Sequence, residues 1–165
     1  MDSTGLILID LTNNFFNNLS LEDQDLLKET IPTLVELAQK KEIPILTTQW
    51  GLDEKIVSFL EKYHLKKVSR RYDSNSDNVF EEKKVKNWVE EYSLDSIIYA
   101  GVNANECVLS SIKGGNNLDL KTITAYDIIA QGKTSNRNFF DENNLKRTVN
   151  EYFQDLDDLI KKYLD

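Results

Sequence analysis

Short apolar runs alternate along the chain with longer segments in which apolar residues recur at helical spacing. Residues 6–9 are continuously apolar, a pattern typical of a parallel strand that is covered on both faces. Between residues 21 and 41 the apolar positions instead fall about three or four residues apart, which predicts a helix with one apolar face. Pro32 lies within this segment, so we expect the regular helix to begin near that residue or to kink there.

The same alternation continues to the end of the sequence. Predicted strands cover residues 6–9, 43–48, 67–69, 96–101 and 120–125. Predicted helices cover residues 21–41, 53–63, 79–92 and 140–164, and a further helix begins near Cys107 and is capped by Gly114 and Gly115. Strands that alternate with helices predict an α/β fold, a doubly wound parallel sheet of five or six strands with helices on both faces, in three αβα layers.

The composition is that of a single acidic domain, residues 1–165. The formal net charge is -8, the isoelectric point is about 4.8 and no basic stripe is present, so we do not expect a nucleic-acid partner. One cysteine cannot form an internal disulfide, which favours a reducing compartment. The sequence shows neither a signal peptide nor a membrane-spanning apolar run, so a cytoplasmic protein without a membrane partner is expected.

Polar residues at the carboxyl ends of the predicted strands are the candidates for chemistry, because ligands of doubly wound sheets bind there. These candidates are Asp10, the segment 48–50, the segment 70–72, the segment 103–107, and Asp127. Asp10 directly follows an apolar strand, where a carboxylate is costly unless it meets a partner. Its side chain therefore either caps the following turn or belongs to a functional site.

Cys107 is the only cysteine and lies where a predicted strand gives way to a helix. Unpaired N–H groups and the positive end of the helix dipole at such a junction favour the thiolate, the form that attacks electrophiles. A lone cysteine is also commonly a small buried apolar residue. Because the first and fourth strands are adjacent in the usual doubly wound order, Asp10 can meet Cys107 and act as a general base toward its thiol.

Two motifs around these residues resemble those of the isochorismatase-like cysteine hydrolases. Residues 6–15, Leu-Ile-Leu-Ile-Asp-Leu-Thr-Asn-Asn-Phe, are similar to the family's first-strand motif, apolar-apolar-Asp-Met-Gln-Asn-Asp-Phe. Residues 99–108, Tyr-Ala-Gly-Val-Asn-Ala-Asn-Glu-Cys-Val, are similar to its nucleophile motif, Gly-Val-x-Thr-x-x-Cys-Val. Residues 125–127 and Gly132 resemble its downstream Asp-Ala segment, so the resemblance runs from the first strand to about residue 132.

The resemblance implies an Asp-Lys-Cys triad that cleaves amides and related bonds through a covalent cysteine intermediate. Asp10 and Cys107 match the first and last members of that triad. Residues 68–74 match the third motif and place Arg70 on the lysine, whereas using Lys66 or Lys67 would break the match of the strand. Arginine keeps a positive charge that can hold Asp10 and favour the thiolate, but it does not readily exchange a proton.

Other matched positions imply further features of the site. Ala104 and Thr12 stand where the family often has threonine and glutamine, and the polar residues 74–76 replace an apolar or aromatic ending, which predicts a more polar pocket wall. A cis peptide bond that is common in the family would fall between Val102 and Asn103. Trp50 is equally well explained as a core residue. The predicted substrate-binding residues are Phe15, Gln49, Trp50, Tyr72, Val102 and Asn103.

We expect neither a metal nor a cofactor. Nicotinamidase-type members of this fold use an Asp-x-His…His group after the second strand, and the Thr-Gln-Trp sequence of residues 48–50 supplies neither ligand type. His64, the only histidine, is expected to be a solvated residue at a helix end. The sequence has no P-loop motif, and a dehalogenase-type phosphatase would need an aspartate where Thr12 stands.

The sequence therefore predicts a metal-independent isochorismatase-like hydrolase that cleaves an amide or related C–N bond of a small-molecule substrate. Cys107 would be the nucleophile and Asp10 the general base and acid, with Arg70 in place of the usual lysine. The alternative is a catalytically degenerate member of the same fold that binds a small molecule or a protein, which the change to Arg70 favours. Oligomers are common among relatives of this kind, so a homo-oligomer stays an open expectation.

Overall fold

A computed structural model describes residues 3–51, 54–70, 76–132 and 140–165 of the chain. At its centre is a parallel sheet with the strand order β3-β2-β1-β4-β5-β7, and a short strand, β6, pairs with β4. The strands are β1 (Thr4–Ile9), β2 (Ile45–Trp50), β3 (Lys66–Arg70), β4 (Ser96–Val102), β5 (Lys121–Ala125), β6 (Ile129–Ala130) and β7 (Glu151–Phe153). The direction of strand order reverses between β1 and β4, and ligands of such sheets bind beyond the carboxyl ends of the strands at this point.

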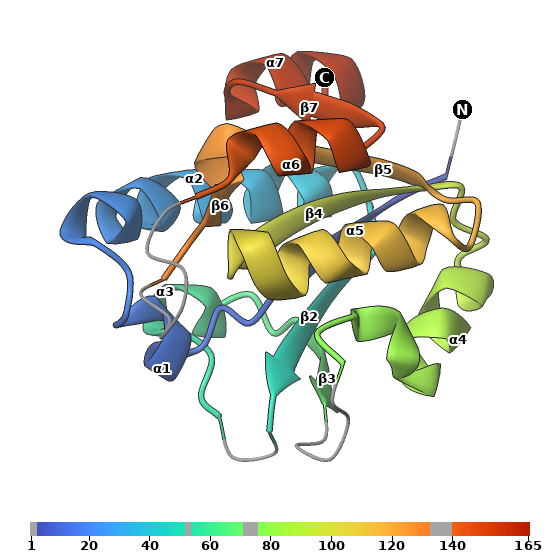
Figure 1. Ribbon diagram of the computed structural model, residues 1–165. Coiled ribbons are helices and arrows are strands. Elements are labelled where there is room, and N and C mark those ends of the chain that lie inside the picture. The colour runs from blue at the N-terminus through green and yellow to red at the C-terminus, as the bar shows by residue number, and fades with distance from the viewer. Residues whose placement is uncertain (1–2, 52–53, 71–75, 133–139) are drawn as a thin grey trace.

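Helices cover both faces of the sheet. They are α1 (Asn13–Phe16), α2 (Leu21–Lys40), α3 (Ser58–Glu61), the 3-10 helix η1 (Val79–Glu81), α4 (Lys83–Glu91), the π-helical turn η2 (Ala104–Val108), α5 (Leu109–Asn116), the 3-10 helix η3 (Tyr126–Ile128), α6 (Glu142–Thr148) and α7 (Leu156–Tyr163). Figure 1 shows α5 in front of the sheet and α2 behind it; α6 contacts α5, and α7 contacts α2. The predicted α/β fold with a parallel sheet is confirmed.

The hydrophobic core follows the apolar runs of the sequence. All of β4 and every residue of β1 except Thr4 are buried, which explains why both strands are continuously apolar rather than alternating. Helix α2 turns its predicted apolar face inward and runs through Pro32, so the expectation that the helix begins at that residue is wrong. Within the described ranges no helix combines the length and the hydropathy that crossing a bilayer requires.

The prediction of one terminal helix over residues 140–164 is wrong. This segment forms α6, β7 and α7, and β7 pairs with β5 as a further parallel strand. Two aspartates begin the two helices separately: the Asp141 carboxylate accepts a hydrogen bond from the Asn144 N–H at 3.1 Å, and Asp155 accepts one from the Asp158 N–H at 2.9 Å. The apolar spacing in this segment fits one long helix as well, so periodicity did not separate the two arrangements.

Smaller predictions are also corrected. Strand β2 extends to Trp50, whereas residues 49 and 50 were expected beyond its end. The helix predicted over residues 53–63 is described only as the short α3, and the one predicted over residues 79–92 is divided at Glu82 into η1 and α4. Gly114 and Gly115 lie inside α5 rather than capping it. Glycine fits these positions because a Cβ atom there would collide with Asn78 and with the Tyr99 hydroxyl, respectively.

Candidate active site

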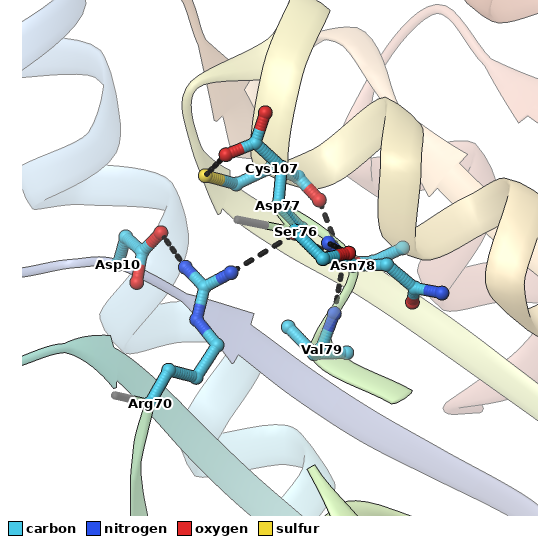
Figure 2. A network of polar contacts seen from close by, with 8 residues as sticks. Asp10, Arg70, Ser76, Asp77, Asn78, Val79 and Cys107 are labelled. Atoms are coloured by element: carbon cyan, nitrogen blue, oxygen red, sulfur yellow. Dashed lines mark hydrogen bonds and ion pairs between the residues drawn. The ribbon is translucent and has the colours of Figure 1, made fainter. Parts of the chain in front are cut away.

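Three polar side chains meet at the carboxyl edge of the sheet. Asp10 directly follows β1, Arg70 is the last residue of β3, and Cys107 lies in the π-helical turn that follows β4. Figure 2 shows the Arg70 guanidinium directed at Asp10, and Cys107 and Asp77 lying next to each other. The structure thus brings together the three residues that the sequence proposes as catalytic, although they come from distant parts of the chain.

The backbone around Asp10 departs from the strand so that its carboxylate enters this group. Asp10 has a φ of 51°, its N–H donates to the Thr48 carbonyl at 2.9 Å, and its own carbonyl accepts a hydrogen bond from the Thr12 N–H at 2.8 Å. The turn after β1 is therefore closed by the backbone of Asp10. Its carboxylate accepts from Arg70 instead of capping the turn, so the interpretation of Asp10 as a turn cap is wrong.

Arg70 uses its planar fork to join two segments of the chain. Its Nη2 forms an ion pair with Asp10 Oδ2, and its Nη1 donates to the Asp77 carbonyl at 2.9 Å. The guanidinium also stacks on Trp50, with Cζ 4.6 Å from the ring centroid. Asp10 and Arg70 are only 0% and 1% exposed, so this ion pair is shielded from solvent.

Glycine at position 101 lets β1 and β4 approach closely beside Asp10. Gly101 has a φ of +124°, and a Cβ atom there would lie 2.8 Å from the backbone nitrogen of Ile9. A side chain at this position would therefore displace the end of β1, from which Asp10 projects. The close packing of the two central strands fixes how the carboxylate approaches the loop that carries the cysteine.

Ser111 connects the backbone of Cys107 to helix α5 and to η1. The Cys107 carbonyl accepts from Ser111 Oγ at 2.6 Å, and Ser111 Oγ in turn accepts from the Val79 N–H at 3.1 Å. The Val102–Asn103 peptide bond is cis, as the resemblance implies. The Cys107 thiol donates to Asp77 Oδ1, with 3.7 Å between Sγ and the oxygen.

Burial has the largest effect on the pKa values of Asp10 and Cys107. Burial raises the pKa of Asp10, and the charge of Arg70 offsets only part of that rise. Burial also raises the pKa of the Cys107 thiol; the Asp10 carboxylate raises it further, while Arg70 lowers it. Cys107 is 5% exposed, and burial therefore favours the protonated thiol over the thiolate.

The family model for the isochorismatase domain matches residues 4–150. The chain belongs to the isochorismatase family. A search of curated proteins gave no match.

Solved structures with this isochorismatase fold share little sequence with the chain. An isochorismatase-like hydrolase from Alkaliphilus metalliredigens has 16% identity and a TM-score of 0.78, with 98% of this chain and 99% of that chain covered. A cysteine hydrolase from Pseudomonas syringae pv. phaseolicola has 13% identity and a TM-score of 0.78, covering 97% and 92%. The YcaC gene product from Escherichia coli, an octameric hydrolase of unknown specificity, has 15% identity and a TM-score of 0.73, covering 93% and 77%.

The residues predicted to bind substrate in this isochorismatase domain take different positions. Trp50 lies against Arg70, whereas Gln49 alternates to the opposite face of the sheet and donates to Ser69 Oγ at 3.1 Å and to the Gly51 carbonyl at 3.2 Å. Phe15 is half-buried against the core. The remaining predicted residues are Val102, buried at the end of β4, Asn103, whose Oδ1 accepts from the Gly132 N–H at 2.9 Å, and Tyr72, which lies outside the described residues.

Asp77 is the residue of this site that sequence reasoning missed. It contacts the Cys107 thiol and also lines an adjacent polar cavity of about 500 Å³, together with Asn105, Glu106 and Lys113. The available signal was weak: Asp77 follows the polar stretch that replaces the usual ending of the family's third motif. Across the residues that the structure describes, no group of three or more histidine, cysteine or acidic side chains could hold a metal ion.

Proposed function

We propose that the protein is a cysteine hydrolase that cleaves an amide or a related C–N bond of a small molecule. Cys107 is the nucleophile, Asp10 is the general base and acid, and Arg70 stands in place of the lysine usual in the family. The observation that carries the proposal is the convergence of these three side chains, from β1, β3 and the turn after β4, in one buried group.

The proposed reaction begins with proton transfer from Cys107 Sγ to the Asp10 carboxylate. The thiolate attacks the carbonyl carbon of the substrate, and Asp10 returns the proton to the leaving nitrogen as the C–N bond breaks. Water then attacks the thioester, with Asp10 again accepting a proton, and this step releases the acid and the free thiol. Support comes from Asp10 Oδ1, which is buried and has no hydrogen-bond partner among the described residues.

Arg70 has an electrostatic role in this scheme. Its charge stabilises both the Asp10 carboxylate and the Cys107 thiolate, because the guanidinium offsets part of the rise in pKa that burial causes in each group. Arginine does not deprotonate at ordinary pH, so the proton passes only between Cys107, Asp10, water and the substrate. We also propose that the protein assembles as a homo-oligomer, for which the octameric YcaC hydrolase is the precedent.

Turnover of a panel of small amides and N-carbamoyl compounds tests the proposal. We expect amine or ammonia release by the wild type, an acyl adduct on Cys107 by intact mass spectrometry, and neither with Cys107→Ala. Arg70→Lys should raise turnover by up to about tenfold, because a lysine can exchange a proton. Arg147→Lys makes the same change on exposed helix α6 and should leave the rate unchanged.

A second candidate is a binding module without turnover, which the raised pKa and the burial of the Cys107 thiol favour. The same panel separates the two functions. Ligands that bind wild type and Cys107→Ala equally, without amine release or adduct in the wild type or in Arg70→Lys, would contradict the hydrolase and support the binding module.

A further inference from the structure

An exposed carboxylate, that of Asp77, lies against the buried Cys107 thiol. Its Oδ1 accepts the thiol hydrogen bond with 3.7 Å between the two heavy atoms, and the residue is exposed, unlike Asp10, Arg70 and Cys107. Its backbone is held in place, because the Asp77 carbonyl accepts from Arg70 Nη1 at 2.9 Å. A molecule that approaches Sγ from solvent therefore meets this carboxylate beside its target atom.

The charges of Asp10, Arg70 and Asp77 do not cancel. Arg70 neutralises Asp10 in the buried ion pair, and among the described residues no side chain forms an ion pair with Asp77. One net negative charge remains at the side chain that is open to solvent. Its field reaches the buried atoms, since Asp77 raises the pKa of both Asp10 and Cys107.

A polar cavity of about 500 Å³ lies beside Asp77. The Asp77 carboxylate lines it, and among the described lining residues Lys113 is the only cation. Asn105 and Asn144 add neutral polar groups to the wall. The Asp77 carboxylate at this place stabilises a positively charged group of a bound molecule and repels a carboxylate or a phosphate.

We propose that Asp77 sets the charge selectivity of the site, which accepts small molecules that carry a positive charge near the reacting bond and rejects anionic ones. This inference rests on the proposed function, because it takes the Cys107 thiol as the place where the molecule reacts. The substrate class that follows is an amide or related C–N compound with an amino group close to the scissile bond.

Three methanethiosulfonate reagents measure this selectivity without any substrate: the neutral methyl reagent, the cationic aminoethyl reagent and the anionic sulfonatoethyl reagent. The chain has one cysteine, so every modification occurs at Cys107. Rates are measured for the folded protein and, as the reference, for the chain unfolded in urea. We expect the cation-to-anion rate ratio of the folded wild type to exceed the unfolded ratio by about tenfold or more, as a carboxylate close to Sγ requires.

Asp77→Asn should bring the ratio of the folded protein down to that of the unfolded chain. The matched control is Asp119→Asn, which removes the same charge from an exposed turn at the opposite edge of the sheet, where a φ of 57° suits asparagine. That control should keep the wild-type ratio, because the effect belongs to Asp77 and not to the net charge of the molecule.

Three results would overturn the proposal: a ratio unchanged by Asp77→Asn, an equal change in both variants, or a folded protein that none of the reagents modifies. The first two results leave the hydrolase proposal standing, because they concern charge preference and not reactivity, whereas a Cys107 thiol that no reagent modifies would contradict both proposals. Conversely, charge-selective modification without hydrolysis of any amide would contradict the hydrolase proposal alone.

Discussion

Arg70 and Asp10 form a buried ion pair that stabilises the fold only when both members are present. Each charge loses its hydration in the core, and their mutual attraction offsets that cost only while the pair is complete. The stacking on Trp50 and the hydrogen bond to the Asp77 carbonyl hold the guanidinium in one orientation. The replacement of lysine therefore changes the packing around the site as well as its proton chemistry.

Removing both members of this pair should lower the free energy of unfolding by less than the sum of the two single removals. We expect Asp10→Asn to lower the free energy of unfolding by about 3 kcal/mol, because it leaves the Arg70 charge buried without a counter-charge. In the double variant with Arg70→Met the loss should be clearly smaller than the sum of the two single losses. Urea unfolding of the four proteins measures the coupling.

The exposed pair of Lys66 and Glu91 supplies the control for this cycle. A coupling of about 1 kcal/mol or less is expected there, since solvent screens the two charges. Equal coupling in the exposed and the buried pair would contradict the account given for Asp10 and Arg70.

At the scale of elements, β7 is tied to the last helix by a cluster of charges. Glu151, in β7, pairs through Oε1 with Lys121 Nζ of β5 at 2.7 Å and accepts from Lys162 Nζ and Tyr163 Oη of α7 through Oε2, at 2.7 and 2.8 Å. Partial burial alone would raise the pKa of Glu151, but these three hydrogen bonds together lower it to about 2. The carboxylate thus joins two strands and a helix of the carboxyl-terminal region.

This cluster should weaken in acid. Because the folded-state pKa of Glu151 is depressed, its contribution to stability is complete above the unfolded-state pKa near 4.5 and is lost as the pH falls toward 2. Over this window we expect the wild type to lose about 1 kcal/mol more of its free energy of unfolding than Glu151→Gln, a figure reduced for solvent screening. Denaturant unfolding at several pH values measures this, and Glu81→Gln, at an exposed carboxylate of η1, is the control. Parallel curves for the wild type and Glu151→Gln would contradict it.

The elements also show where sequence reasoning succeeds and where it fails. Strands β1 and β4 could be predicted because burial on both faces demands continuous apolar residues, and that demand is visible in the sequence itself. Strand β7 could not, because its three residues are all half-buried and take their strand geometry from pairing with β5. The residues of α6 and α7 have helical spacing, and of the two capping aspartates only Asp155 lies between these helices, where it marks the start of α7.

For the whole molecule, the alternation of strands and helices was enough to predict the fold and the edge of the sheet where chemistry is possible. The meeting of Asp10 with Cys107 followed from strand order, since β1 and β4 are neighbours, whereas Arg70 was placed by the resemblance of residues 68–74 to the family's third motif. The contact of Asp77 with the thiol did not follow, because its position depends on the hydrogen bond from Arg70 to its backbone carbonyl. Such contacts are set by tertiary geometry and leave no pattern in the sequence.

The strand that carries Arg70 stands at one end of the sheet order, with a hydrogen-bonded neighbour on one side only among the described strands. Asp10 and Cys107 instead project from the two central strands, which are fixed on both sides. A terminal strand detaches at a lower free-energy cost than a central one. Fraying of β3 would withdraw the Arg70 charge while Asp10 and Cys107 stay in place. We therefore expect the easiest opening of this group to be the loosening of β3, which separates Arg70 from the other two side chains.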